Sequence, residues 1–203
     1  MNPAWQQTRH AWIFDLDGTL TIAQHDFDAM RTALGVPPGA LILEFIATQS
    51  SARQTQLHAQ LDDIEIALAN KARPAPGALA LLEGLQRCGC PIGILTRNTL
   101  RNARAALRSI GALAMFDDEH ILGRDEVAPK PDPAGIHQLL MAWQCSPNDA
   151  TMVGDYRFDM EAGRNAGCYT VHVSAGRPER WPAITDLHLP NLLALGKLAL
   201  REG

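Results

Sequence analysis

Lysine is scarce in this sequence of 203 residues, because only three of its 18 basic residues are lysines: Lys71, Lys130 and Lys197. The formal net charge is −4, and no stretch of the chain concentrates basic side chains. A nucleic-acid partner is therefore not expected, since such proteins carry a basic patch or stripe. Where arginine fills nearly every basic position, a lysine outside a predicted helix, such as Lys130, is a candidate for a specific role.

Long apolar runs and paired cysteines are also missing. No run approaches the roughly 20 apolar residues of a membrane span, and the first ten residues, "MNPAWQQTRH", lack the apolar centre of a signal peptide. The four cysteines form no CxxC pair; they are Cys88, Cys90, Cys145 and Cys168. These absences predict a reduced, cytoplasmic protein with no membrane partner.

Helical and extended patterns divide the chain into two parts. Residues 10–14, "HAWIF", read as a short buried strand, and from Asp26 to about Arg73 the spacing of apolar residues becomes helical. The stretch "RPAPG" at 73–77 then breaks the pattern. We therefore expect a core domain of residues 1–21 and 76–203, interrupted by a helical insertion at 22–75.

After the insertion, helical and strand patterns alternate. Buried strands are predicted at 90–96, 150–155 and 168–174, with a short strand within 119–126, and helices stand between them. The last segment has the pattern of an edge strand and a helix. Such alternation predicts an α/β fold, a Rossmann-like doubly wound parallel sheet with helices on both faces, in which the insertion follows the first strand.

Residues capable of chemistry follow four of the predicted strands. In open α/β sheets, ligands bind beyond the carboxyl ends of the strands, so these residues would meet at one edge. The set consists of Asp15 and Asp17 after the first strand, Thr96, Arg97 and Asn98 after the second, Lys130 near the third, and Asp155 and Asp159 after the fourth.

A cluster of carboxylates is electrostatically costly without a counter-ion, and a divalent cation removes that cost. Mg²⁺ prefers oxygen ligands and is usually held by one or two carboxylates together with substrate phosphate. A carboxylate such as Asp15 can then attack phosphorus to form an aspartyl phosphate. Thr96 and Lys130 could stabilise the charge on the oxygens of the transferring group.

Four motifs in this chain resemble those of the haloacid dehalogenase-like (HAD) superfamily of phosphohydrolases. "DLDGTLT" resembles the first motif, DxDGT; "ILTRN" the second; Lys130 in "PKPDP" the third; and "VGDYRFD" the fourth, GDxxxD. They occur in the order of the family. The insertion resembles the small α-helical cap of phosphoglycolate phosphatase-like members.

The resemblance implies roles for these residues. Asp15 would be the nucleophile, and Asp17 the acid that protonates the leaving group and the base that then activates water. Asp15, Asp155 and the backbone carbonyl of Asp17 would ligate Mg²⁺, and Asp159 would support the metal or orient Lys130. Gly18 and Thr19 would shape the turn after the nucleophile, and Thr96 and Lys130 would bind phosphate. By position alone, Arg97 after Thr96 could also reach the phosphate or the substrate, and a surface arginine fits equally well; Asn98 is expected to support the site. Dehalogenases of the superfamily lack the second acid, so Asp17 points to phosphate esters.

Each residue also has a plain structural interpretation when it is taken alone. An Asp-Gly pair is usually a turn, and Thr96 fits a strand end or a helix N-cap. Lys130 fits a solvated loop, and Arg124 in "LGRDE" is expected at the surface or in a loop. All of these interpretations would have to hold together for the site to vanish. The expected function is thus a Mg²⁺-dependent phosphatase of a small phosphorylated metabolite. A sugar phosphomutase and a non-catalytic phosphate-binding protein are the alternatives, and the oligomeric state is left open.

Overall fold

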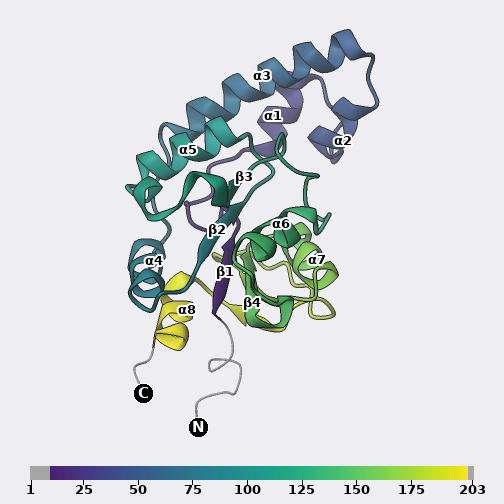
Figure 1. The fold of residues 1–203 in the computed structure, drawn as a ribbon. Coiled ribbons are helices and arrows are strands. Elements are labelled where there is room, and N and C mark those ends of the chain that lie inside the picture. The colour runs from purple at the N-terminus through teal and green to yellow at the C-terminus, as the bar shows by residue number, and fades with distance from the viewer. Residues whose placement is uncertain (1–9, 201–203) are drawn as a thin grey trace.

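The computed structural model describes residues 10–200, and within them six strands form one sheet in the order β3-β2-β1-β4-β5-β6. Every neighbouring pair is parallel, which confirms the predicted doubly wound α/β fold (Figure 1). The strands are β1 (Ala11–Phe14), β2 (Ile92–Leu95), β3 (Ile121–Leu122), β4 (Ala150–Gly154), β5 (Tyr169–Val173) and β6 (Leu187–Leu189).

Helices cover both faces of the sheet. On one face lie α4 (Ala78–Arg87), α5 (Leu100–Ser109) and α8 (Leu192–Ala199), and on the other lie α6 (Ala134–Ala142) and α7 (Arg157–Asn165) (Figure 1). In the part of the core that the structure describes, short 3-10 turns lie at η2 (Leu113–Met115), η3 (Asp118–His120) and η4 (Pro147–Asp149). Among the helices of residues 10–200, we find none with the length and apolar character that crossing a membrane requires.

The two hydrophobic layers follow from the alternation of side chains along β1. Trp12 and Phe14 pack with α4, α5 and α8, whereas Ala11 and Ile13 pack with α6 and α7. All four residues are buried, as expected for a parallel sheet that is covered on both faces. This is why residues 11–14 read as a continuous apolar run.

The predicted insertion contains three helices, α1 (Phe27–Leu34), α2 (Ile42–Ala47) and α3 (Ser51–Ala69), and we call residues 22–75 the cap. Its helices share a small hydrophobic core of their own, formed by Met30, Leu34, Val36, Ile46, Leu57 and Leu61. The helical pattern extended to about residue 73, but α3 ends at Ala69. The exact boundaries at 22 and 75 stay a prediction.

The chain leaves the core and returns to it at neighbouring points. The backbone N–H of Ile22 donates to the carbonyl of Arg73 at 2.9 Å, and that of Ala75 donates to Leu20 at 2.8 Å. The two chain segments that connect the cap to the core are thus hydrogen-bonded to each other. The first of them follows directly after the first acidic motif.

The sheet changes its winding direction beside β1. From β1 the chain adds β2 and β3 on one side, and β4, β5 and β6 extend the sheet on the other. The carboxyl ends of β1 and β4 are adjacent, since Phe14 pairs with Val153. This is the topological switch point at which open α/β sheets bind ligands.

Candidate active site

Asp15, Lys130 and Asp159 meet at the switch point. Asp15 follows β1, Lys130 lies in the loop before α6, and Asp159 lies in the first turn of α7. The ammonium group Nζ of Lys130 is 2.6 Å from Oδ1 of Asp15 and 2.6 Å from Oδ1 of Asp159. All three residues are buried, so the surface-loop interpretation of Lys130 is wrong and the lysine is the counter-charge of two buried acids.

Asp155 completes the acidic group at the end of β4. Its Oδ1 accepts a 3.5 Å hydrogen bond from the hydroxyl of Thr19, and its Oδ2 pairs with Nη1 of Arg177 at 2.6 Å. Arg177 follows β5 and belongs to none of the sequence motifs, so the sequence analysis missed it. The only sequence signal for Arg177 is that it is a basic residue shortly after the strand that follows β4 in the chain, at the same edge of the sheet.

Burial and repulsion from neighbouring carboxylates raise the pKa values of Asp155 and Asp159. The pKa of Asp155 is raised to about 8, mainly by burial and then by the neighbouring carboxylates of Asp15 and Asp159, against the opposing effects of Arg177 and Lys130. Burial also raises the pKa of Asp159 to about 6, against the opposing effect of Lys130. Burial lowers the pKa of Lys130, but its two carboxylate partners outweigh that effect and the pKa is raised.

The acidic group fits a hard divalent cation. One carboxylate oxygen from each of Asp15, Asp155 and Asp159 lies within 4.8 Å of the other two. Oxygen-only donors of this kind suit Mg²⁺ or Mn²⁺ rather than softer metals. A bound cation would also relieve the repulsion that raises the pKa of Asp155.

Two glycines allow the acids to come this close. Gly18 has φ +94°, which side-chain-bearing residues rarely adopt, and a Cβ there would collide with the carboxylate of Asp155. A Cβ on Gly154 would collide with the side chain of Asp159. Both "DG" of the first motif and "GD" of the fourth therefore have a steric reason for their glycine.

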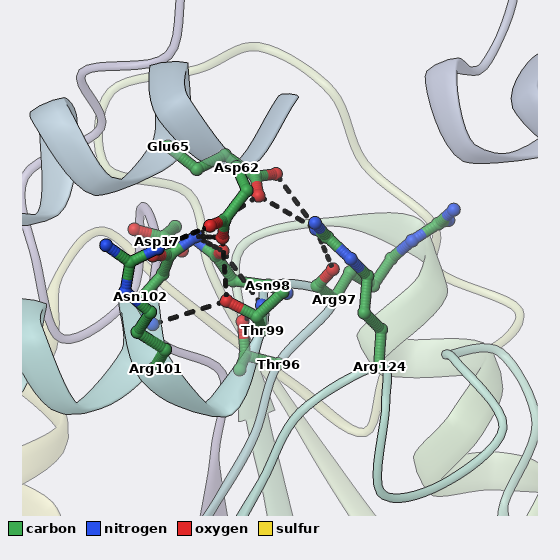
Figure 2. A network of polar contacts seen from close by, with 10 residues as sticks. All are labelled: Asp17, Asp62, Glu65, Thr96, Arg97, Asn98, Thr99, Arg101, Asn102 and Arg124. Carbon is green, nitrogen blue, oxygen red and sulfur yellow. Dashed lines mark hydrogen bonds and ion pairs between the residues drawn. The ribbon is translucent and has the colours of Figure 1, made fainter. Parts of the chain in front are cut away.

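Asp17 lies at the cap side of the site, half-buried. Its Oδ2 accepts a 3.2 Å hydrogen bond from Nδ2 of Asn98 (Figure 2). Burial raises the pKa of Asp17, His25 lowers it, and Asp15 raises it again, with a net upward direction. Thr96 is buried beside it, and its hydroxyl accepts a 3.1 Å bond from the backbone N–H of Asn98. Asp17, Thr96 and Asn98 therefore share one polar corner.

Arg97 faces the cap instead of the acids. Its Nη2 is 2.6 Å from Oε1 of Glu44 on α2, and its guanidinium lies 4.5 Å from the ring centroid of Phe158. Of the predicted site residues, Asp15, Asp17, Gly18, Thr19, Thr96, Asn98, Lys130, Asp155 and Asp159 come together, whereas the side chain of Arg97 is engaged elsewhere.

The cap contacts the core through buried charges. α3 runs along α5 (Figure 1), and Glu65 of α3 accepts bonds from Nη1 of Arg124 at 3.0 and 2.9 Å. Arg124 lies in the turn after β3, as the loop alternative predicted, but its side chain is 6% exposed and so does not lie at the surface. Arg124 also donates to the carbonyl of Arg97 at 3.1 Å, and Figure 2 shows it between the cap and the second motif.

Glu65→Gln is expected to gain thermal stability relative to the wild type as the pH rises from about 5 to about 7. Burial raises the pKa of Glu65 to about 7, outweighing Arg124, while Asp17 and Asp62 add to the rise. The folded state therefore holds a proton that the unfolded state releases above pH 4.5, and the wild type loses up to about 3 kcal/mol through this window. Above pH 7 the difference between the two proteins should be constant.

The measurement is the difference in melting temperature between the variant and the wild type across pH 5 to 8. The matched control is Glu83→Gln, a change at an exposed glutamate of α4, for which the difference should not vary with pH. A pH-independent difference for Glu65→Gln would contradict the assigned titration.

Comparison with protein families finds one model, described as haloacid dehalogenase-like hydrolase, that matches residues 22–173. An uncharacterized hydrolase of Saccharomyces cerevisiae is 31% identical over 166 residues, covering 79% of this chain and 75% of that protein. A phosphoglycolate phosphatase of Rhodospirillum rubrum is 31% identical over 194 residues, covering 82% and 80%.

Solved structures share the fold. CbbY from Rhodobacter sphaeroides, whose crystal structure is a complex with phosphate, superposes with a TM-score of 0.75 at 24% identity. The match covers 93% of this chain and 96% of that one. The similarity extends over the cap as well as the sheet.

Proposed function

The chain belongs to the haloacid dehalogenase-like hydrolase family, and from this premise we propose that it hydrolyses a small phosphorylated metabolite through an aspartyl phosphate on Asp15, with Mg²⁺. Its enzyme class is that of the phosphoric monoester hydrolases. The observation that carries the proposal is the buried group of Asp15, Lys130, Asp155 and Asp159 at the sheet's switch point. We further propose that it acts in the cytoplasm on a small phosphate ester.

The first step is nucleophilic attack by a carboxylate oxygen of Asp15 on phosphorus. The bond between phosphorus and the ester oxygen breaks, and Asp17 donates a proton to the departing oxygen. The raised pKa of Asp17 supports this role, because the carboxyl then holds its proton more readily at neutral pH. In the second step Asp17 accepts a proton from water, which attacks phosphorus and releases phosphate and free Asp15.

Lys130 and Thr96 bind the oxygens of the transferring group. Lys130 carries a fixed positive charge beside Asp15, at 2.6 Å, where negative charge is transferred. Asp159 holds the other side of the ammonium group and so aims it at the nucleophile. Arg97 would assist only if it left Glu44, to which it is paired.

Asp15, Asp155 and the backbone carbonyl of Asp17 would hold the cation. When bound, Mg²⁺ supplies positive charge that stabilises the phosphoryl oxygens and the carboxylates around them. The chain contributes the oxygen donors, the steric room provided by Gly18, and Thr19, whose hydroxyl orients Asp155.

Phosphate release should require a divalent cation. With p-nitrophenyl phosphate as substrate, excess chelator is expected to lower turnover to background, and Mg²⁺ or Mn²⁺ to restore it. Full turnover in chelator would refute the metal assignment. Accumulation of an isomerised sugar phosphate from a sugar monophosphate and its bisphosphate, without release of phosphate, would instead support a mutase.

A further inference from the structure

Asn102 lies at the centre of the polar network between cap and core. It is on α5, fully buried, and faces Asp62 and Glu65 of α3 (Figure 2). Its Nδ2 donates to Oδ1 of Asp62 at 2.7 Å and to Oδ1 of Asn98 at 3.0 Å, and lies 3.5 Å from Oε2 of Glu65. A single amide group thus contacts the cap and the second motif at once.

The two cap acids determine which way this amide points. The carbonyl oxygen of Asn102 has no hydrogen-bond partner among residues 10–200. A flipped amide would direct that oxygen at two carboxyl groups and remove the donor from all three acceptors. Electrostatics therefore favours the observed orientation as long as Asp62 and Glu65 are docked on α5.

The orientation of the Asn102 amide in turn fixes the orientation of the Asn98 amide, which contacts Asp17. Its Oδ1 accepts from Asn102 and, at 2.9 Å, from the backbone N–H of Thr99. With its oxygen held on that side, its NH₂ group is directed at Oδ2 of Asp17, 3.2 Å away. Figure 2 shows the connected series from α3 to Asp17.

We propose that Asn102 is a positioning residue, through which the docked cap holds the Asn98 amide against Asp17. The proton donor is set in place when the cap covers the site, and is less well placed when the cap is away. Cleavage of the ester bond is thereby favoured in the covered state. The inference rests on the proposed role of Asp17 as proton donor.

The test compares two esters of nearly the same size in the full chain with Mg²⁺. Phenyl phosphate has a poor leaving group that needs a proton, whereas p-nitrophenyl phosphate has a good one that leaves without it. Asn102→Ala is expected to lower kcat/KM for phenyl phosphate about 10-fold more than for p-nitrophenyl phosphate, a part of the total that acid catalysis contributes. A loss of cap packing alone would affect both esters equally.

Asp62→Asn is the second variant, in case Asn102→Ala does not fold. It keeps the shape of the side chain but removes a charge that orients the amide, so a smaller change in the same direction is expected. The matched control is Arg101→Ala, which removes the 2.6 Å ion pair of Asp62 at the exposed rim and leaves the contacts of Asn102 in place. For this control the ratio of the two esters should equal that of the wild type.

Asp17→Asn distinguishes failure of the positioning role of Asn102 from failure of the proposed role of Asp17. This variant should shift the ratio further than Asn102→Ala does. If Asp17→Asn shifts the ratio but folded Asn102→Ala and Asp62→Asn do not, the positioning role is overturned and the role of Asp17 stands. If Asp17→Asn leaves the ratio unchanged, the proposed role of Asp17 fails, and the inference falls with it.

Discussion

Asp15→Asn is expected to abolish phosphate release, with a loss of about 10⁴-fold or more, as when the nucleophile of a covalent mechanism is removed. The amide oxygen of Asn is a much weaker nucleophile than a carboxylate and cannot form the aspartyl phosphate. The substitution would also remove one of the two carboxylates that form ion pairs with Lys130. The measurement is phosphate release from p-nitrophenyl phosphate at saturating Mg²⁺.

The control for this change is Asp63→Asn, the same chemical substitution at an exposed acid of α3, which should retain wild-type turnover. A folded Asp15→Asn protein that turned over within about 10-fold of the wild type would rule out Asp15 as the nucleophile. Mass spectrometry of the quenched wild-type enzyme gives an independent check, since a phosphoryl adduct should appear on the peptide that contains Asp15.

Lys130→Met should damage both activity and folding. The activity loss is expected to be about 10²–10³-fold, the size seen when one donor to a developing negative charge is removed. Met fills a similar volume but leaves Asp15 and Asp159 buried without their common cation. Breaking such a buried pair from one side costs about 3–5 kcal/mol.

Urea unfolding and steady-state kinetics measure the two effects of Lys130→Met. Lys71→Met, at an exposed lysine just beyond α3, serves as the matched control and should change neither quantity. A variant with normal activity and an unfolding free energy within about 0.5 kcal/mol of the wild type would place Lys130 outside the site. Loss of stability with full activity would make it a structural residue only.

The sequence was sufficient for the parts of the site that are fixed by strand ends. Three residues of the site stand directly after an apolar strand, namely Asp15, Thr96 and Asp155, and Asp17 lies two residues beyond Asp15. The parallel sheet brings such positions to one edge. The same reasoning predicted a parallel sheet but not its strand order, because the neighbours of β1 depend on which helices cover which face. Those choices follow from long-range packing.

The residues between cap and core could not be found in the same way. The apolar residues Leu57, Leu61, Ile64 and Leu68 recur at helical spacing along α3, but the buried face of the helix runs through Leu57, Leu61, Glu65 and Ala69. An acid on the buried side is not visible to a search for apolar periodicity, and Arg124, its partner, lies 59 positions away. Arg177 was missed for a related reason, since its contact with Asp155 depends on the path of the loop after β5.

The paired ends of the cap have a consequence for how such enzymes diversify. Thr21 and Pro74 form a β-bridge, so the two ends of the cap segment are held together where they join the core. In its effect on the core, the whole cap is therefore equivalent to a closed loop. The entropy of closing a loop rises only slowly with its length, by about 0.6 kcal/mol for each doubling. A longer, shorter or unrelated cap can therefore replace this one at the junction, in evolution or by grafting. The acids at the edge of the sheet would keep their positions.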